Sequence, residues 1–393
     1  MNRRIALLAA LAVGLSACSS QTPSPTTSAS ASEGPQSSPT ASPATTAPPS
    51  TATPQPTETG LPLATLIGQK LVIRMDGTTP SASLLGRIRR GEIGGVILFA
   101  FNIVSAAQLT ALTTQLRQAA ADGGQPPFLI ATDQEGGSVK RVPWAPPTLS
   151  PPQMAADGLP ATAFDQGFAT GGALRELGIN VDLAPVADVP ATRKSFMYLE
   201  GRTFSFDAPV VSSLAGSFAS GLASASVVGS MKHFPGIGFA ELNTDRNVVT
   251  IKASRDSLAA GLTPYSDAMT GGGLELVMLS NAIYPVYDPD NAAGWSAAIS
   301  TGLLRNELGF GGCSITDSLN GIAKAMGVAP RTLAIKAAIA GTDLLLLTGT
   351  EASTITAHDA LVAAATAGTI PRDTLDQSYQ RILTLKDRYL VGP

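Results

Sequence analysis

The sequence predicts an α/β fold of the TIM type, a (β/α)₈ barrel, on three observations. Beyond residue 60, short apolar runs alternate with longer amphipathic or alanine-rich stretches, as in β-α-β units around a parallel sheet. Eight such repeats follow one another. Residues 61–393 also suit a barrel of about 250 residues with insertions. A doubly wound open sheet is the alternative, but no Gly-x-Gly-x-x-Gly loop follows the first strand to support it.

The apolar runs predicted to be strands are residues 71–74, 95–99, 128–132, 181–185, 227–231, 274–279, 313–316 and 344–347. Among the stretches between them, helices are expected at residues 106–121, 161–177, 209–224 and 331–340. In a parallel barrel the loops that follow the strands form the functional face, so residues just after each run are candidates for the site.

The composition indicates a large apolar core and limits the partners. Hydrophobic residues make up 44% of the chain and charged residues 14%. A net charge of -3 without a dense Lys/Arg cluster gives no reason to expect nucleic acid. The carboxylates are too scattered to suggest a metal site and no haem or nucleotide motif is present, so we expect no cofactor. We expect a monomer.

The first 17 residues are typical of an export signal. Arg3 and Arg4 precede an apolar stretch, residues 5–15, that is too short to cross a bilayer as a mature helix. The run Leu15-Ser16-Ala17-Cys18 resembles a bacterial lipobox, which implies cleavage before Cys18 and acylation of its thiol. Acyl chains would tether the protein to the outer side of a membrane. The alternative is an ordinary secretory peptide with a chance cysteine.

Residues 18–60 are predicted to be a disordered tether. From Ser19 onward they are almost wholly Ser, Thr, Pro, Ala, Gln and Gly, so they cannot bury enough apolar surface to offset the entropy of ordering. The catalytic barrel would then comprise residues 61–393. Cys313 is the only other cysteine, and we expect it to be a small buried residue without a disulfide to Cys18.

Polar residues cluster at the predicted strand ends. In chain order they are Asp133 and Glu135, Asp182 and Asp188, Arg202, Lys232 and His233, Ser280 and Asn281, and Asp317. One acidic residue at such a place would be ordinary, because helix N-caps favour it. Acids and bases from five loops that meet at one rim instead predict a pocket for a polyol. Carboxylates accept hydrogen bonds from sugar hydroxyls, while Arg and Lys donate to others.

Several of these runs resemble one known family, in the order that the family has them. They are Gly95-Val96-Ile97-Leu98-Phe99 with Asn102, Asp133-Gln134-Glu135-Gly136-Gly137, Asp182-Leu183-Ala184-Pro185-Val186 with Asp188, Arg202-Thr203-Phe204, Lys232-His233-Phe234-Pro235-Gly236, Leu308-Gly309-Phe310-Gly311-Gly312 and Thr316-Asp317-Ser318-Leu319. The chain thus resembles glycoside hydrolase family 3, specifically the single-barrel β-N-acetylhexosaminidases that act on peptidoglycan sugars.

The resemblance implies that Asp317 is the nucleophile and that hydrolysis retains the anomeric configuration. A carboxylate at a strand tip is well placed to attack an anomeric carbon and form a glycosyl-enzyme. Asp317 could instead cap the following helix. The resemblance also implies that Asp133, Arg202, Lys232 and His233 bind the sugar, although His233 alone could be a core histidine. Asp188 could equally be structural.

The chain departs from that family branch at its general acid/base. The branch has an Asp-Ser-His run where this chain has Asn243-Thr244-Asp245, and His358, the second of only two histidines, falls in a distant helical stretch. We take Asp245 as the provisional acid and Glu241 as the second candidate. An acid needs a raised pKa, from burial or from the charge of Asp317. Asp245 could also be a solvated loop residue or form an Asx-turn.

These expectations favour a retaining exo-β-N-acetylhexosaminidase that removes terminal β-linked N-acetylglucosamine from cell-wall fragments. It would be extracytoplasmic and anchored to the cell membrane through lipid on Cys18. Another family 3 exo-β-glycosidase, such as a β-glucosidase, is one alternative. A surface lipoprotein that binds glycans with little turnover is another, because the histidine is missing.

Overall fold

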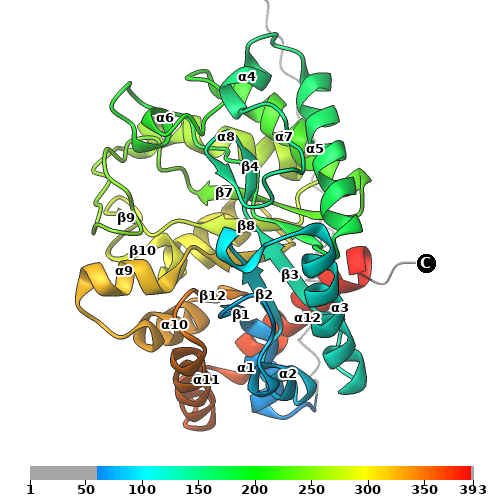
Figure 1. Ribbon diagram of the computed structural model, residues 1–393. Helices are drawn as coiled ribbons and strands as arrows, with labels where there is room; N and C mark the ends of the chain where they lie inside the picture. Colours follow the sequence, from blue (N-terminus) through cyan, green and yellow to red (C-terminus); the bar gives the residue numbers. More distant parts are fainter. Residues whose placement is uncertain (1–59, 391–393) are drawn as a thin grey trace, which may run out of the picture. The chain divides into compact units, whose positions relative to one another are not determined.

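The computed structural model describes residues 60–390, which form a barrel around one parallel eight-stranded sheet (Figure 1). The strand order is β11-β8-β7-β6-β3-β2-β1-β12, and every neighbouring pair is parallel. The two end strands meet where the Leu344 N–H donates to Ser314 O at 2.8 Å and Leu344 O accepts from Thr316 N at 3.0 Å. The predicted barrel is therefore confirmed, and the open sheet is excluded.

All eight predicted strands are present. Their bounds are β1 (Leu71–Arg74), β2 (Gly95–Leu98), β3 (Leu129–Thr132), β6 (Val181–Asp182), β7 (Val228–Phe234), β8 (Leu276–Leu279), β11 (Cys313–Thr316) and β12 (Leu345–Leu347). β6 is shorter than predicted because Pro185 has no N–H to continue the ladder, although Ala184 O still accepts from Ser230 N at 2.8 Å. β7 is longer than predicted. Lys232 and His233 therefore lie within the last residues of this strand, at its carboxyl end as expected, although the predicted strand ended at residue 231.

Helices cover the outside of the barrel between successive strands. The longer ones are α1 (Leu63–Lys70), α2 (Ala82–Arg89), α3 (Ala106–Asp122), α5 (Pro160–Glu176), α7 (Ala208–Ser224), α8 (Arg255–Thr270), the π-helix η3 (Ala298–Glu307), α9 (Leu319–Met326), α10 (Pro330–Ile339), α11 (Glu351–Thr366) and α12 (Arg372–Leu390); α4 (Pro151–Ala155) and α6 (Phe196–Leu199) are short. The four predicted helices are confirmed within one residue. α2, α3, α8 and α11 begin after a Ser or Thr whose side chain accepts from the backbone N–H three residues on.

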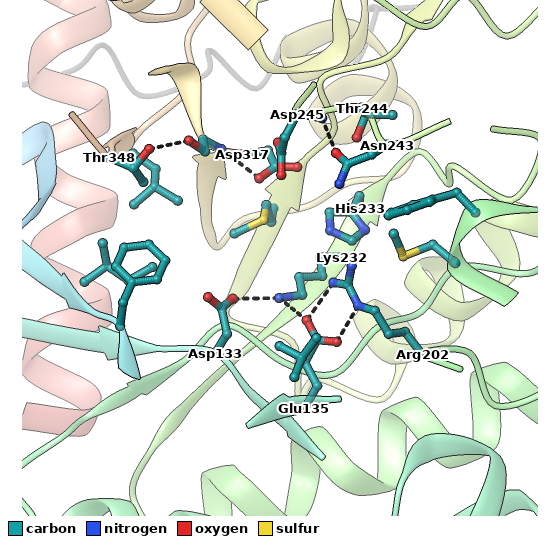
Figure 2. A pocket seen from close by; sticks show the side chains of 18 of the residues that line it. Asp133, Glu135, Arg202, Lys232, His233, Asn243, Thr244, Asp245, Asp317 and Thr348 are labelled. Atoms are coloured by element: carbon teal, nitrogen blue, oxygen red, sulfur yellow. Dashed lines mark hydrogen bonds and ion pairs between the residues drawn. The ribbon is translucent and has the colours of Figure 1, made fainter. Parts of the chain in front are cut away.

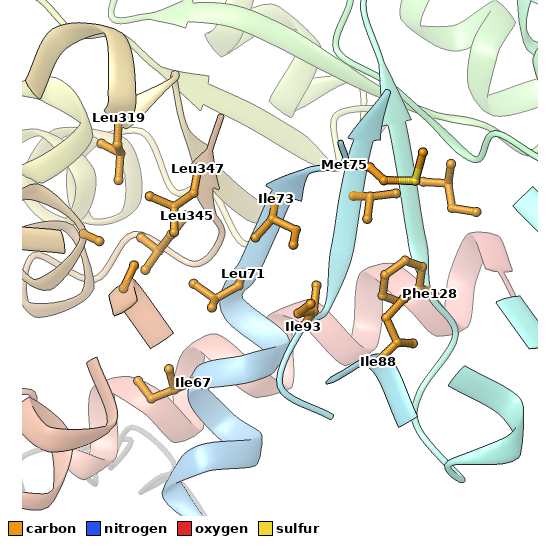
Figure 3. Close-up of a cluster of buried hydrophobic side chains, with 14 of the residues drawn as sticks. Ile67, Leu71, Ile73, Met75, Ile88, Ile93, Phe128, Leu319, Leu345 and Leu347 are labelled. Carbon is orange, nitrogen blue, oxygen red and sulfur yellow. The ribbon is translucent and has the colours of Figure 1, made fainter. Parts of the chain in front are cut away.

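Alternating strand residues divide the core into layers. On β1, Val72 faces the barrel interior, whereas Leu71 and Ile73 face the helices, as the two-residue period of a strand requires. Figure 3 shows the helix-facing cluster beside β1 and β12. The interior layer also contains Ile382 and Leu385 from α12. α12 thus closes the end of the barrel from which the strands begin.

A buried polar network holds α12 in that position. Lys386 Nζ donates to Gln69 Oε1 at 2.7 Å and to Gly94 O at 3.2 Å, just before β1 and β2. Asp343, just before β12, accepts from Arg381 of α12 at 2.8 Å. With this end closed, the carboxyl ends of the strands are the open face of the barrel.

Some sequence predictions fall outside the described residues. The export signal at 1–17, Cys18 and nearly all of the tether at 18–60 are among them. Cys313 is buried and unpaired, as predicted. Between residues 60 and 390, no helix combines the length and the apolar character needed to cross a membrane.

Candidate active site

A cavity of about 220 Å³ opens at the carboxyl ends of the strands (Figure 2). All six residues predicted to catalyse or to bind sugar line it: Asp133, Arg202, Lys232, His233, Asp245 and Asp317. Its floor is apolar, because Ile97, Met278 and Leu346 are the last interior residues of their strands. The cavity is smaller than the usual range for drug-sized ligands, about 300–1,000 Å³, and suits a ligand the size of one sugar ring.

Four charged residues form one side of the cavity, here called the anchor cluster: Asp133, Glu135, Arg202 and Lys232. Lys232 Nζ lies 2.9 Å from Asp133 Oδ1 and 2.6 Å from Glu135 Oε1. Arg202 binds Glu135 through two parallel hydrogen bonds of 2.8 and 2.7 Å. Side chains from β7 and from the loop after β6 thus converge on the Glu135 carboxylate. This geometry holds Lys232 and Arg202 in fixed positions at the cavity wall.

Glu135 was noted in the sequence only as a polar residue after the third strand and was given no role in binding or catalysis. Burial alone would raise its pKa, but the charges of Lys232 and Arg202 and their hydrogen bonds hold the pKa at about 2. Burial would likewise lower the pKa of Lys232, and the charges of Asp133 and Glu135 raise it instead. Glu135, Arg202 and Lys232 therefore stay ionised at neutral pH. The signal available in the sequence was Glu135's place in the Asp-Gln-Glu-Gly-Gly run.

A small hairpin positions Glu135. Its strands are β4 (Gln134–Gly136) and β5 (Val139–Lys140). Gln134 is buried and fixes the hairpin, because its amide accepts from Val142 N at 3.0 Å and donates to Val142 O at 2.9 Å. Gly136 has a φ of +91°, and a Cβ there would lie 2.5 Å from Leu149 O. Only glycine satisfies both conditions, which explains this part of the motif.

His233 is held by Asp188. The ring Nδ1 lies 2.7 Å from Asp188 Oδ2, and Asp188 Oδ1 accepts from Ile237 N at 2.7 Å. Asp188 is fully buried and does not line the cavity, so its role is to orient the ring. Lys232 and His233 both line the cavity although they are adjacent, and the register of β7 against β8 shifts at this point. With Nδ1 engaged, Nε2 is the nitrogen left for a ligand.

Asp317 directly follows β11 on another side of the cavity (Figure 2). Its N–H donates to Leu279 O at 2.9 Å, and its Oδ1 accepts from Ser318 N at 2.7 Å. The residue that precedes α9 as its N-cap is Ser318, so Asp317 does not fill the alternative role of a helix cap. One oxygen of the carboxylate is thereby oriented by the backbone.

Asp245 reaches the cavity from the loop after β7. Its Oδ1 accepts from Asn281 Nδ2 at 2.9 Å, and the same amide donates to Ser318 O at 3.1 Å. The Asx-turn in this loop belongs to Asn243, whose Oδ1 accepts from Asp245 N at 2.8 Å, so the turn-forming alternative for Asp245 is wrong. Gly321 of α9 permits this approach, because a Cβ there would lie 2.6 Å from Asp245 O.

The environment raises the pKa of Asp245 to about 7. Burial is the largest cause and the negative charge of Asp317 the second, whereas His233, the Asn281 hydrogen bond and Arg202 act in the opposite direction. Glu241, the other candidate acid, is exposed and does not line the cavity.

Two neighbouring carboxyl groups of which one readily holds a proton can supply an acid and a nucleophile. Asn281, which tethers Asp245, was noted in the sequence only as a polar strand end.

For residues 60–390, no group of three or more His, Cys, Asp or Glu side chains comes together as a metal site would require.

Comparisons with known proteins agree with this geometry. Residues 65–385 match the family described as "Glycosyl hydrolase family 3 N terminal domain". A protein of Arthroderma benhamiae named "Uncharacterized secreted glycosyl hydrolase" is 34% identical over 334 residues, which are 83% of this chain and 94% of the relative. A "Beta-hexosaminidase" of Nitrosomonas eutropha is 37% identical over 259 residues, 63% of this chain and 72% of the relative.

Solved structures are similar as well. A family 3 β-N-acetylglucosaminidase from Paenibacillus sp. FPU-7 superposes with a TM-score of 0.80 at 31% identity, covering 85% of this chain. The chain spans 64% of that longer protein. A β-N-acetylhexosaminidase from Beutenbergia cavernae superposes with a TM-score of 0.75 at 32% identity, covering 83% of this chain and 99% of that one.

Proposed function

This chain belongs to glycosyl hydrolase family 3, and we propose that it is a retaining exo-β-N-acetylhexosaminidase with Asp317 as nucleophile and Asp245 as general acid/base. That it is a glycoside hydrolase follows from the family and from its hexosaminidase relatives. The observation that carries the finer assignment is the pair of carboxyl groups in one cavity, of which Asp245 has its pKa raised to about 7. The names of the relatives support the choice of amino sugar.

In the first step, the anchor cluster holds the terminal sugar ring with its anomeric carbon at Asp317. Protonated Asp245 donates its proton to the glycosidic oxygen while the Asp317 carboxylate attacks the carbon. The bond to the leaving sugar breaks, and a covalent glycosyl-Asp317 ester forms. The leaving sugar departs with the proton from Asp245.

The second step reverses the roles. Once Asp317 is an ester it has no negative charge, and one cause of the raised pKa of Asp245 disappears. The now ionised Asp245 accepts a proton from water, which attacks the anomeric carbon and releases Asp317. Two displacements at the same carbon restore its original configuration. A single carboxyl group thus serves as acid and then as base because its neighbour changes charge.

The natural substrate that we propose is a cell-wall fragment with terminal β-linked N-acetylglucosamine. A cavity for one ring suits removal of a terminal sugar rather than cleavage inside a polymer. A panel of nitrophenyl β-glycosides tests the sugar. We expect the N-acetylglucosaminide to be cleaved with a kcat/KM well above that of the glucoside. Preference for the glucoside would make the protein a β-glucosidase instead.

Trapping of the covalent glycosyl-enzyme tests the assignment of Asp317 as the nucleophile. A 5-fluoro analogue of the N-acetylglucosaminide should accumulate as an ester on the peptide that contains Asp317, and mass spectrometry of the digest would locate it. A label on another carboxylate would overturn the assignment. The Asp317→Asn variant should remain folded and should not be labelled.

We further propose that the protein is extracytoplasmic and held at the cell membrane by lipid on Cys18, through the tether at 18–60. The support is the lipobox-like run before Cys18. The test compares full-length protein with Cys18→Ala after expression in a bacterium that processes lipoproteins. We expect the wild type in the membrane fraction and the variant in the soluble extracytoplasmic fraction. Equal membrane association of the two would refute lipid anchoring.

A further inference from the structure

Two stacked phenylalanines extend the wall of the cavity outward to solvent. Phe99, at the end of β2, lines the cavity. The ring of Phe101 stacks on it with centroids 5.8 Å apart and planes within 11°. Phe101 is nevertheless 54% exposed. A single exposed apolar side chain is ordinary, but this one stacks on a ring that lines a ligand cavity.

The loop that carries the two rings is fixed in place. It forms the 3₁₀ turn η1 (Ala100–Asn102), and Asn102 is fully buried. The Asn102 side chain accepts from Phe99 N at 2.9 Å and donates to Met75 O at 3.1 Å and to Gly77 O at 2.5 Å. The loop after β2 is thereby attached to the loop after β1. A surface held in this way loses little freedom when a ligand binds to it.

Sheet order places the two rings on the rim between Asp133 of the anchor cluster and Asp317. β2 lies between β3 and β1, and β1 is followed by β12 and β11. In the anchor cluster Asp133 follows β3, and the other members come from β4, β7 and the loop after β6, whereas Asp317 follows β11. A ring held by the cluster with its anomeric carbon at Asp317 directs its leaving group away from the cluster, toward the rest of the rim. The exposed ring of Phe101 is on that rim.

We propose that Phe101, supported by Phe99, forms a binding surface for the leaving sugar, so that the substrate class is a β-linked oligosaccharide rather than a simple glycoside. This deepens the proposed function and rests on it. A pyranose ring has one face of C–H groups, and this apolar, slightly positive face complements the negative face of an aromatic ring. The guanidinium groups of Arg74 and Arg141 lie 5.7 and 5.8 Å from the centroids of Phe101 and Phe99. Each ring thus has a cation over part of one face, which helps to hold it in place.

The test compares a disaccharide with a monosaccharide in the wild type and Phe101→Ala. N,N′-diacetylchitobiose occupies both the cavity and the proposed surface, whereas N-acetylglucosamine, used as a competitive inhibitor, needs only the cavity. We expect Phe101→Ala to lower kcat/KM for the disaccharide about three- to tenfold, the value of one lost stacking contact. The inhibition constant of the monosaccharide should stay within about twofold of wild type. Phe101→Trp should retain most of the activity.

Phe168 of α5 provides a matched control. It is 50% exposed and stacks on Phe164 with centroids 6.3 Å apart, but neither ring lines the cavity. Phe168→Ala should leave both measurements unchanged. The proposal is overturned if Phe101→Ala leaves the disaccharide unaffected, or if it changes disaccharide and monosaccharide constants equally.

The behaviour of the wild type separates this proposal from the proposed function. Cleavage of cellobiose but not of the chitin disaccharide would refute the hexosaminidase, and the same comparison would then use cellobiose and glucose. If the wild type cleaves no disaccharide, binding is measured instead. The dissociation constants of the disaccharide and of the monosaccharide are then compared in the Asp317→Asn variant. The proposed binding surface is supported if Asp317→Asn binds the disaccharide more tightly than the monosaccharide and the double variant with Phe101→Ala does not. Equal binding of the two sugars refutes it.

Discussion

Lys232 and Glu135 form an ion pair of 2.6 Å although their side chains are only 3% and 1% exposed. Charges so deeply buried are tolerated only when their hydrogen-bonding capacity is met, and Arg202 and Asp133 complete it here. The pair therefore links ligand binding to stability. The same contacts that hold the cationic groups at the cavity wall also compensate their desolvation.

Replacing Glu135 with Gln should destabilise the protein by about 3–5 kcal/mol, because two cations remain buried without their shared counter-charge. Denaturant unfolding at pH 7 measures this. Glu307→Gln is the matched control, since Glu307 pairs with Arg255 at 3.4 Å on the surface and should contribute less than about 1 kcal/mol. Equal effects of the two variants would contradict the assigned role.

The contribution of Glu135 should also depend on pH in a defined direction. Its folded-state pKa of about 2 lies below the ordinary value of 4.5. A depressed carboxyl pKa stabilises the folded state above pH 4.5, and that stabilisation is lost as the pH falls toward 2. The difference in unfolding free energy between wild type and Glu135→Gln should therefore shrink across this interval. A difference that is constant with pH would argue against a charge effect.

Asp245→Asn should reduce activity steeply on substrates with poor leaving groups and much less on aryl glycosides, which need little protonation. Kinetics on chitobiose and on a dinitrophenyl glycoside make the comparison. Because protonated Asp245 is the acid, wild-type kcat/KM should fall as the pH rises above about 7, and the variant should lose this alkaline limb. Similar small losses on both substrates would remove Asp245 from the mechanism.

The same substitution should stabilise the protein at alkaline pH. The folded-state pKa of Asp245, about 7, exceeds its ordinary value of 3.8. Because its pKa is raised in the folded state, Asp245 favours the folded state most below pH 3.8. This contribution to the unfolding free energy is lost as the pH rises through 7. Asp245→Asn avoids that loss, so it should be more stable than wild type by about 1 kcal/mol or more at pH 8 and nearly equal near pH 4. Asp165→Asn, at an exposed position of α5, should show no such trend.

Gly321→Ala should lower kcat although Gly321 itself is not a catalytic residue. The added methyl group would lie 2.6 Å from Asp245 O, so the loop that carries the acid must move. A displacement of this kind can reduce the rate about tenfold or more. Gly172→Ala in α5 is the control, because no atom lies within 4 Å of the added group. Unchanged kinetics in Gly321→Ala would show that the loop accommodates the methyl group elsewhere.

The barrel could be predicted because its signals are local. An apolar run such as residues 313–316 has a strand's length and composition wherever the chain takes it, and β11 has those bounds. The extent of β7 could not be predicted in this way. Lys232 and His233 are polar, and the strand continues through them because Lys232 and Phe234 pair with β8.

The residues of the site could likewise be predicted only in part, and those that depend on distant contacts were missed. Asp133, Lys232 and Asp317 were predicted from their places after or within strands and from motifs, and the structure brings them to one cavity. Glu135 was missed as a site residue because its importance depends on Arg202, which is 67 positions away in sequence. Asp188 could not be assigned for the same reason, since its contact with His233 spans 45 positions.

The closure of the barrel determines the order in which the molecule can be completed. β1, near the start of the described chain, takes its second neighbour only from β12, with Leu71 opposite Leu345. Until residues 345–347 are in place, β1 and β11 both have an unpaired edge, and the floor provided by α12 is missing as well. Contacts so distant in sequence form slowly. The cavity is therefore incomplete until the final strand has docked, because that strand and the residue after it provide its Leu346 floor and its Thr348 wall.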